Sequence, residues 1–267
     1  MAKKSINNQK RSIRGPNMLK EERYDKILSI LEKDGYASAA KLSQMLYVSL
    51  PTIRRDLAEL SRKNQIIRSH GGAKVVQAEH IVAPLNFRKT VNSHEKRELC
   101  RYAASMVKDY DIIFIDSSTT TLQMADFLSD KKGITVITNG IPIATLLVQK
   151  GIKTYCTGGE IFENSLAHFG SFAEEFIGRF NIDTLFFSCH GVSEKGMLTD
   201  PSLPETQIRK VAINQSKKTV FLCDETKFSL STPYNLAHIE TMDCVITNSD
   251  KAGKYFRSQD SDKIIIV

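Results

Sequence analysis

Apolar residues recur at helical spacing between residues 18 and 62. A first helix is predicted by four of them at i, i+3, i+4 and i+7, namely Tyr24, Ile27, Leu28 and Leu31. Ser38 can cap a second helix, and Ser49 can cap a third, in which Pro51 is tolerated in the first turn. On a helical wheel, the third helix has one buried stripe, formed by Ile53, Leu57 and Leu60. We therefore expect three short helices around a shared core.

The outward face of the third helix is basic. Arg55 and Arg62 point almost directly away from the buried stripe, and Thr52 and Arg54 flank them. Two short helices joined by a tight turn, the second with such an outward row, form the layout of a helix-turn-helix. Arginine reads guanine bidentately, and threonine contacts phosphate or a thymine methyl. Ser49 and the free N–H groups at the helix start can also hold a phosphate. Ser38 and Pro51 are counted with these residues as candidate DNA contacts.

A small hairpin is predicted directly after this helix. Short apolar segments at 66–69 and 73–76 flank the turn His70-Gly71-Gly72. This wing makes Arg68, His70 and Lys74 available for contacts to a nucleic-acid backbone. A basic three-helix unit by itself would also suit a protein-docking bundle. The helix spacing, the charge and the wing together favour a DNA-binding domain over a protein-docking bundle.

The charge of the chain is concentrated at its beginning. Residues 1–76 hold 16 lysines and arginines against 7 acidic residues, out of 37 and 30 in the whole chain. The other 191 residues are therefore nearly neutral, and the net charge of +7 arises in the first third. Such asymmetry indicates a polyanion-binding module joined to a neutral body, although a solvated charged face would give the same counts.

The second part of the chain alternates short apolar runs with helical stretches, which is typical of βαβ units and a mainly parallel sheet. After a helix that starts at Ser93 and runs to about residue 107, strands are expected at 112–115, 134–138, 153–156, 184–188, 219–223, 244–247 and 264–267. Helices are expected between them at 119–128, 141–149, 172–179 and 205–215. The predicted fold class is therefore an N-terminal winged helix-turn-helix followed by a mainly parallel α/β domain.

Ligands of parallel sheets bind where strands end and helices begin, so the loops at these places are candidates for a binding site. The first strand is followed by residues suited to cradling a phosphate: Asp116, Ser117, Ser118, Thr119 and Thr120. The later strands end at or run into Asn139, Gly158, Gly159, His190 and Lys227. Each loop also has a purely structural explanation, because hydroxyls cap helices and glycines turn the chain.

Several function classes lack their sequence signals. There is no GxxxxGK[ST] loop, no strand followed by GxGxxG and no GxSxG elbow, and the histidines lack metal-ligand spacing. Five scattered cysteines without a CxxC suit a reducing compartment, and no apolar run approaches the length of a membrane span. We expect a cytoplasmic protein that is not an enzyme, with no cofactor, no metal and no membrane contact.

The expected domain organisation has four parts. Residues 1–17 are read as a disordered basic arm, and residues 18–76 as the DNA-binding domain. Residues 77–92, of mixed polarity and without a clear period, are read as a linker. Residues 93–267 form the α/β domain.

The residues of the first domain resemble the DeoR-type helix-turn-helix signature. The resemblance rests on Arg23, Ile27 and Leu31, on the run 49–57 (SLPTIRRDL) and on the wing run 68–73 (RSHGGA). Members of that family usually begin near the position of Met18, so residues 1–17 depart from the pattern.

The resemblance continues to the end of the chain. The segments 115–120, 136–139, 157–159, 183–191 and 224–228 resemble the sensor domain of DeoR-type repressors, which is similar to ribose-5-phosphate isomerase and CoA-transferase folds. In that family the domain commonly binds a phosphorylated sugar. The family's first loop usually reads Asp-x-Gly-Thr-Thr, whereas Ser118 stands here in place of the glycine. Its side chain either blocks close approach of a phosphate or supplies another donor.

The resemblance implies a transcription regulator, most simply a repressor of a carbohydrate-metabolism operon. Its partners would be a double-stranded DNA operator and a phosphorylated sugar that changes the affinity for that operator, and it would act as a dimer or tetramer on paired half-sites. One alternative is a sugar-phosphate isomerase or CoA-transferase-like enzyme with a DNA-binding head. Another is a DNA binder whose sensor no longer functions.

Overall fold

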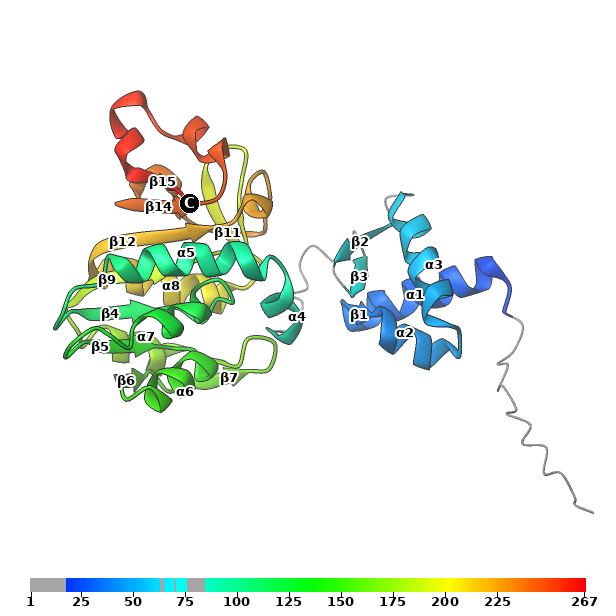
Figure 1. Ribbon diagram of the computed structural model, residues 1–267, viewed down its shortest axis with the longest axis horizontal. Coiled ribbons are helices and arrows are strands. Elements are labelled where there is room, and N and C mark those ends of the chain that lie inside the picture. The colour runs from blue at the N-terminus through cyan, green and yellow to red at the C-terminus, as the bar shows by residue number, and fades with distance from the viewer. Residues whose placement is uncertain (1–17, 63–64, 70, 76–84) are drawn as a thin grey trace, which may run out of the picture. The chain divides into compact units, whose positions relative to one another are not determined.

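A computed structural model of the protein describes residues 18–62, 65–69, 71–75 and 85–267 (Figure 1). The chain divides into two units, with the division between Ala78 and Glu79, and each unit is described by itself. Among the described residues, no helix is long and apolar enough to cross a membrane.

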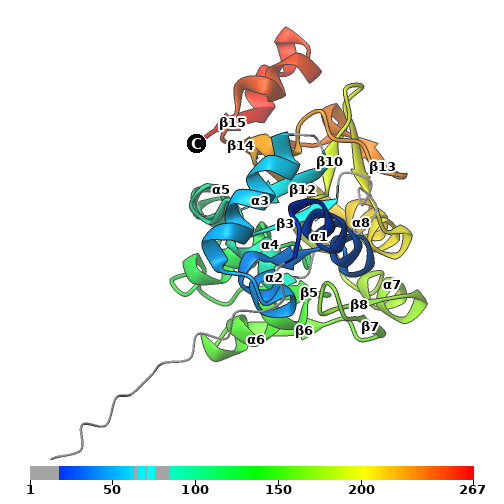
Figure 2. The same cartoon turned by 90° about the vertical axis from the view of Figure 1, so that its right-hand side faces the viewer.

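The first unit contains three helices and a small antiparallel sheet (Figures 1 and 2). The helices are α1 (Lys20–Asp34), α2 (Ala39–Leu46) and α3 (Leu50–Arg62). The strands are β1 (Ala37–Ser38), β2 (Ile66–Ser69) and β3 (Gly72–Val75), and β3 lies between the other two. β2 and β3 are the predicted wing.

The core of the first unit is formed by the predicted apolar stripes. Ile53, Leu57 and Leu60 of α3 are buried, and they belong to one cluster with Ile27 and Leu31 of α1. Because side chains spaced three and four residues apart lie on one face of a helix, the periodicity alone was sufficient to predict this core.

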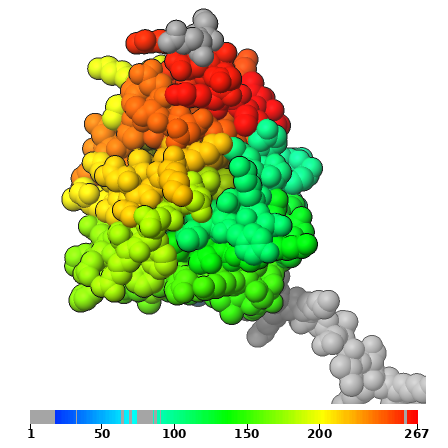
Figure 3. Space-filling view, turned by 90° about the vertical axis from the view of Figure 1, so that its left-hand side faces the viewer, coloured from blue at the N-terminus to red at the C-terminus, as the bar shows by residue number. Residues whose placement is uncertain are grey.

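The second unit is built on a sheet of seven strands in which all neighbours are parallel. The strands are β4 (Ile112–Ile115), β5 (Thr135–Thr138), β6 (Lys153–Cys156), β9 (Ile182–Phe187), β12 (Ser216–Cys223), β14 (Cys244–Thr247) and β15 (Ile264–Ile266). Their order in the sheet is β15-β14-β12-β9-β4-β5-β6. The colours across the face in Figure 3 follow this order, from green through yellow to red. All seven predicted strands are confirmed.

Both faces of this sheet are covered, so its central strands are buried on both sides. The side chains of β4 alternate between two cores: Phe114 packs into one, and Ile113 and Ile115 pack into the other. The first core is closed by α7 (Ser171–Ile177) and α8 (Leu203–Gln215), and the second by α5 (Ser93–Ser105) and α6 (Ile141–Gln149). The described part of this unit also contains five 3₁₀ helices: Thr121–Phe127, Glu225–Lys227, Ile239–Thr241, Asp250–Tyr255 and Ser258–Lys263.

Three features of the second unit differ from the sequence-based expectation. The segment 77–92, expected as a linker, contains the short helix α4 (Leu85–Thr90). A hairpin of β7 (Glu160–Phe162) and β8 (Ala167–Phe169) and a sheet of β10 (Gly191–Val192), β11 (Met197–Asp200) and β13 (Tyr234–His238) were not predicted. The helix expected at 119–128 is a shorter 3₁₀ helix. These elements are short, and their stability comes from tertiary packing rather than from a local periodic pattern.

Candidate DNA-binding surface and effector site

The turn before α3 has the geometry of a helix-turn-helix. Tyr47 adopts a left-handed conformation, with φ of 53°, which ends α2 and redirects the chain. The Ser49 hydroxyl accepts a hydrogen bond from the Thr52 backbone N–H at 3.4 Å and lies 2.8 Å from the Thr52 hydroxyl. Ser49 therefore caps α3 as predicted. Ser38 caps α2 in the same way, through the N–H of Lys41 at 3.0 Å.

The outer face of α3 is exposed and carries its arginines. Arg54, Arg55 and Arg62 are exposed, and so is Pro51 in the first turn. On the opposite side of α3, the buried Asp56 accepts two hydrogen bonds from Arg23 of α1, to Oδ2 at 2.5 Å and to Oδ1 at 3.1 Å. This ion pair holds α3 against α1, so the exposed arginines project from a helix of fixed orientation.

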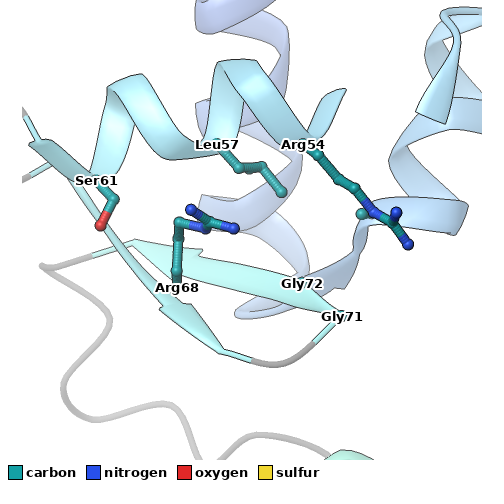
Figure 4. Close-up of a pocket in the computed structure, with 7 residues that line it drawn as sticks. Arg54, Leu57, Ser61, Arg68, Gly71 and Gly72 are labelled. Carbon is teal, nitrogen blue, oxygen red and sulfur yellow. The ribbon is translucent and has the colours of Figure 1, made fainter. Parts of the chain in front are cut away.

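The wing adds a further cation beside α3. Figure 4 shows Arg68 reaching from β2 toward Leu57, across a hollow that Arg54, Ser61, Gly71 and Gly72 also line. His70 lies outside the described residues, and of Lys74 only the backbone, in β3, is described. Among the predicted contact residues, the structure thus brings Arg54 and Arg68 together at one surface hollow.

The second candidate site lies at the carboxyl edge of the parallel sheet. β4 pairs with β5 on one side and with β9 on the other, so the strand order reverses between β4 and β9. Ligands of open α/β sheets bind at such a reversal, outside the carboxyl ends of the strands. The predicted loop 116–120 starts at this point, directly after β4.

Asp116 organises this loop from inside the protein. Its Oδ1 accepts hydrogen bonds from the Ser118 N–H at 3.1 Å and the Thr121 hydroxyl at 2.7 Å. Its Oδ2 accepts from the Ser188 N–H at 3.3 Å and from Arg209 at 3.0 Å. Both carboxylate oxygens are therefore occupied, and Asp116 holds the loop in shape.

Ser118 fits this loop without backbone strain. It is not among the residues with positive φ, so the position does not need glycine for conformational reasons. Its hydroxyl accepts a hydrogen bond from the Thr121 N–H at 3.2 Å and lies 2.9 Å from the Thr121 hydroxyl. The side chain thus binds the first residue of the following 3₁₀ helix and stabilises the loop.

A buried ionic cluster lies beneath the loop. Arg209 of α8 donates to Asp116, to Asp200 at 2.8 Å and to Glu205 at 3.2 Å, and all four side chains are largely buried. Burial raises the pKa of Asp200 to about 6, against the opposing charge of Arg209 and with a smaller contribution from Glu205. The cluster ties the end of β4 to the end of β11 and to α8.

Two lysines converge above the ends of these strands. Lys96 of α5 is 5% exposed, and its Nζ donates to the Arg88 carbonyl at 2.7 Å and to the Thr119 hydroxyl at 3.3 Å. Lys227 donates from Nζ to the Ser188 hydroxyl at 2.9 Å and to the Cys189 carbonyl at 2.7 Å. Within the described residues, neither ammonium group forms an ion pair with a carboxylate.

The two lysines influence each other electrostatically. Burial and, to a smaller extent, repulsion by Lys227 lower the pKa of Lys96 to about 8, against the opposing influence of Asp224. Positive charge that is partly removed from water and not neutralised by a carboxylate is costly. The site is therefore suited to binding an anion.

The remaining predicted loops lie along the same edge of the sheet. Asn139 is buried after β5, and its Nδ2 lies 3.3 Å from the Ser117 hydroxyl, so the first two loops are in contact. Gly158 and Gly159 follow the edge strand β6, both with positive φ. The N–H of His190 donates to Asp200 at 3.0 Å, which connects this residue to the ionic cluster.

Sequence reasoning missed Lys96, Arg88 and Arg209 as site residues. The sequence does indicate that Lys96 is buried, because it shares the helical face of Leu99, Cys100 and Ala103, which are also buried. A lysine on an apolar stripe is buried only where it has a partner or a function. Arg209 likewise shares a face of α8 with Glu205 and Ala212.

Comparison with known proteins identifies both units. The family model described as the DeoR C terminal sensor domain matches residues 91–249, and the model of the DeoR-like helix-turn-helix domain matches residues 23–79. The chain belongs to the DeoR family of transcriptional regulators. The family resemblance drawn from the sequence is therefore confirmed, as is the function of this DeoR-family protein as a DNA-binding transcription regulator.

Individual relatives of this DeoR-family regulator span nearly its whole length. It is similar to the HTH-type transcriptional repressor GlcR of Bacillus subtilis (strain 168), with 32% identity over 86% of this chain and 89% of the relative. It is also similar to the glycerol-3-phosphate regulon repressor of Escherichia coli (strain K12), with 28% identity over 87% of this chain and 92% of the relative. Among solved structures, ribose 5-phosphate isomerase A from Methanocaldococcus jannaschii matches with a TM-score of 0.39 and 18% identity, over 51% of this chain and 55% of its own.

Proposed function

We propose that this DeoR-family protein is a repressor of a carbohydrate-metabolism operon, and that it binds its operator through α3 and the wing. The proposal is supported by the exposed Arg54 and Arg55 on a helix whose orientation is fixed by the Arg23–Asp56 ion pair. Exposed arginines on such a helix can enter the major groove and contact guanine edges. We assign contacts with DNA phosphates to Ser49, Thr52, Arg62 and Arg68. The predicted DNA contacts of Ser38, Pro51, His70 and Lys74 remain part of the same proposal.

We propose further that the second unit binds a phosphorylated sugar, which changes the affinity for the operator. The observation that carries this proposal is the convergence of Lys96 and Lys227, without a carboxylate partner in the described part of the chain, at the reversal point of the sheet. A phosphate dianion would neutralise both lysines and accept hydrogen bonds from the hydroxyls of the adjoining loop. The name of one relative, a glycerol-3-phosphate regulon repressor, agrees with a phosphorylated effector.

The sugar itself needs polar partners beyond the phosphate. Two buried polar atoms in the predicted loops, Thr120 Oγ1 and Asn139 Oδ1, have no hydrogen-bond partner among the described residues. A buried polar atom without a partner costs free energy, so a ligand hydroxyl donating to either would stabilise the complex. We place the phosphate at Ser117, Thr119, Lys96 and Lys227, and the sugar toward Asn139, Gly158, Gly159 and His190.

The geometry favours a sensor over an enzyme. Acid–base catalysis would require a carboxylate within reach of the substrate. Asp116, Asp200 and Glu205 are instead bound by Arg209, and Asp224 accepts hydrogen bonds from Asn92 and Thr226. Turnover of ribose 5-phosphate by the purified protein would contradict this part of the proposal. Binding without turnover is the expected result.

Ser118 supports a working sensor rather than a defective one. Because its hydroxyl is engaged by Thr121, the added side chain stabilises the loop and leaves the Thr119 hydroxyl beside Lys96. We therefore expect Ser118→Gly to bind sugar phosphates no more tightly than the wild-type protein does.

The deciding experiment is a fluorescence anisotropy titration of the full-length protein on DNA from upstream of its own gene. It is repeated at one fixed salt concentration with a panel of sugar phosphates, because electrostatic affinity for DNA depends steeply on salt. Specific binding that one sugar phosphate weakens or strengthens supports the proposal. Specific binding that every ester leaves unchanged would favour a DNA binder without a working sensor.

We also infer that the protein acts as a homo-oligomer, a dimer or a tetramer, since helix-turn-helix proteins read paired half-sites about 34 Å apart. Light scattering after size-exclusion chromatography measures this directly. A monomer at the concentrations that saturate the operator would contradict it.

A further inference from the structure

The short helix α4 is held in place by the loops of the proposed effector site. Leu85 at its start is buried and lines a small apolar pocket with Ser117 and Ser118 after β4 and with Gly140 and Pro142 after β5. α4 therefore packs directly on the loop that follows β4. A helix of six residues is not stable by itself, so these contacts determine whether it forms.

The other end of α4 is bound by Lys96. The Lys96 ammonium donates to the Arg88 carbonyl in α4 and also to the Thr119 hydroxyl in the loop. Arg88 itself donates from Nη2 to the Asn164 carbonyl at 3.0 Å, next to the β7–β8 hairpin. One ammonium group thus connects α4 to the loop at which the phosphate would bind.

The corner between α4 and α5 has a third attachment. Asn92, in a left-handed conformation at the start of α5, donates from Nδ2 to Asp224 at 3.1 Å and to the Thr226 hydroxyl at 3.3 Å. Both partners lie in the loop that carries Lys227. The corner is thereby attached to the loop after β12, in addition to the contacts of α4 with the loop after β4.

We propose that α4 is the element through which ligand binding in the second unit changes the operator affinity of the first. This inference rests on the proposed function, because it assigns a regulatory role to the same effector site. An anion between Lys96 and Lys227 would attract the Lys96 ammonium away from the Arg88 carbonyl, because a hydrogen bond between two opposite charges is stronger than one from the same ammonium to a neutral carbonyl. Losing that bond loosens α4.

Because of its position in the chain, a loosened α4 can affect the DNA-binding unit. The last strand of the DNA-binding unit ends at Val75, and α4 begins at Leu85, so the covalent path from one unit to the other runs through α4. Ligand binding shifts the operator affinity only if some element of the protein differs between the ligand-free and the ligand-bound state. That element must be influenced by both the effector site and the DNA-binding surface. α4 meets the requirement on the sensor side through Leu85, Arg88 and the Asn92 corner.

The test compares two substitutions of a buried leucine in the full-length protein. Leu85→Ala removes the apolar anchor of α4, whereas Leu236→Ala removes a similarly buried leucine from β13, in the core that contains Phe114. Hydrogen exchange of the α4 amides and the Kd for the upstream DNA are measured for both. We expect Leu85→Ala to accelerate exchange in α4 and to shift the operator Kd by about fivefold or more, and Leu236→Ala to do neither.

A second variant covers the case in which Leu85→Ala folds poorly. Lys96→Met removes the bond to the Arg88 carbonyl without enlarging the Leu85 pocket, and it is expected to shift the operator Kd in the same direction. Faster exchange in α4 with an unchanged operator Kd would overturn the proposal. So would unchanged exchange in α4 in both variants.

Ligand probes separate this proposal from the proposed effector. Inorganic phosphate and ribose 5-phosphate are added to the wild-type protein and to Leu85→Ala, with thermal unfolding as the readout of binding. If a probe binds both proteins but changes the operator Kd of the wild type alone, the role of α4 is supported. If neither probe binds the wild type while Leu85→Ala still shifts its operator Kd, the role of α4 stands and these probes are excluded as effectors. If a probe changes the operator Kd equally in both proteins, α4 is not the connection.

Discussion

The Arg209 guanidinium in α8 lies 3.0 Å from the carboxylate of Asp116, which precedes it by 93 residues and directly follows β4. The same guanidinium binds Asp200 and Glu205. Through this one side chain, the loop that begins the proposed effector site is attached to β11 and α8. The loop is therefore held in shape before any ligand binds.

Replacing Arg209 should destabilise the second unit strongly. Arg209→Met leaves three buried carboxyl groups without their cation, and breaking a buried ion pair in this way costs about 3–5 kcal/mol. Arg179→Met is the matched control, because Arg179 forms an exposed pair with Glu175 on α7 and its loss should cost about 0.5 kcal/mol or less. Urea denaturation measures both. Equal free energies of unfolding for the two variants would contradict the structural role of the cluster.

Anion binding should weaken as pH rises through about 8. The pKa of Lys96 is lowered to about 8 by burial and by Lys227, so above that pH the side chain loses the positive charge that attracts the phosphate. Calorimetric titration with inorganic phosphate between about pH 7 and about pH 9 should show the loss. Lys96→Gln should flatten the profile, whereas Lys218→Gln, on the exposed start of β12, should leave it unchanged.

The same pKa shift affects the stability of the ligand-free protein. Between about pH 8 and the ordinary lysine pKa of 10.5, the folded protein has lost the Lys96 proton while the unfolded chain still binds it. Unfolding takes up a proton in this window, so the contribution of Lys96 to the free energy of unfolding rises with pH. Comparison of the wild type with Lys96→Gln in urea isolates this contribution. A difference between the two proteins that stays constant with pH would contradict the lowered pKa.

Removing an exposed arginine of α3 should weaken operator binding and leave the sensor unaffected. Arg55→Ala is expected to cost about 1–3 kcal/mol of operator binding if the side chain reads a base, or to lower the salt slope by about 1 if it contacts a phosphate. Because Arg55 is exposed, its loss should not change the free energy of unfolding or the affinity for phosphate esters. Arg101→Ala is the control, because it removes an exposed arginine of α5 and should leave the operator affinity unchanged. Unchanged operator affinity for Arg55→Ala would refute the assignment of α3 as the recognition helix.

The glycine pair after β6 provides a test of the third loop. At Gly158 (φ +70°) an added Cβ meets nothing within 4 Å, whereas at Gly159 (φ +111°) it would lie 2.5 Å from the Phe169 carbonyl oxygen. Gly158→Ala should therefore lower the free energy of unfolding by about 1–2 kcal/mol, because alanine disfavours the left-handed backbone conformation. Gly159→Ala should destabilise more, because the β8 backbone must also move. Thermal unfolding of both variants shows which is less stable. A less stable Gly158→Ala variant would contradict the packing of this loop.

Local patterns in the sequence determined the elements and the family. The stripe of Ile53, Leu57 and Leu60 predicted α3 because helical spacing places these residues on one face. The strands β4 and β14 begin and end where their apolar runs do, since strands buried on both faces read as continuous apolar segments. The candidate loops followed from these boundaries, because the carboxyl ends of parallel strands share one edge.

Tertiary structure alone decided which of those residues meet and what they do there. Asp116 was predicted as a ligand-binding residue, but its carboxylate is hydrogen-bonded to Arg209. Lys96, one of the cations of the proposed effector site, comes from a helix outside the predicted loops. α4 has no periodic pattern and forms through contacts with residues far away in the sequence. Ion pairs between distant residues and helices stabilised only by packing have no local signature, because the chain must fold before either exists.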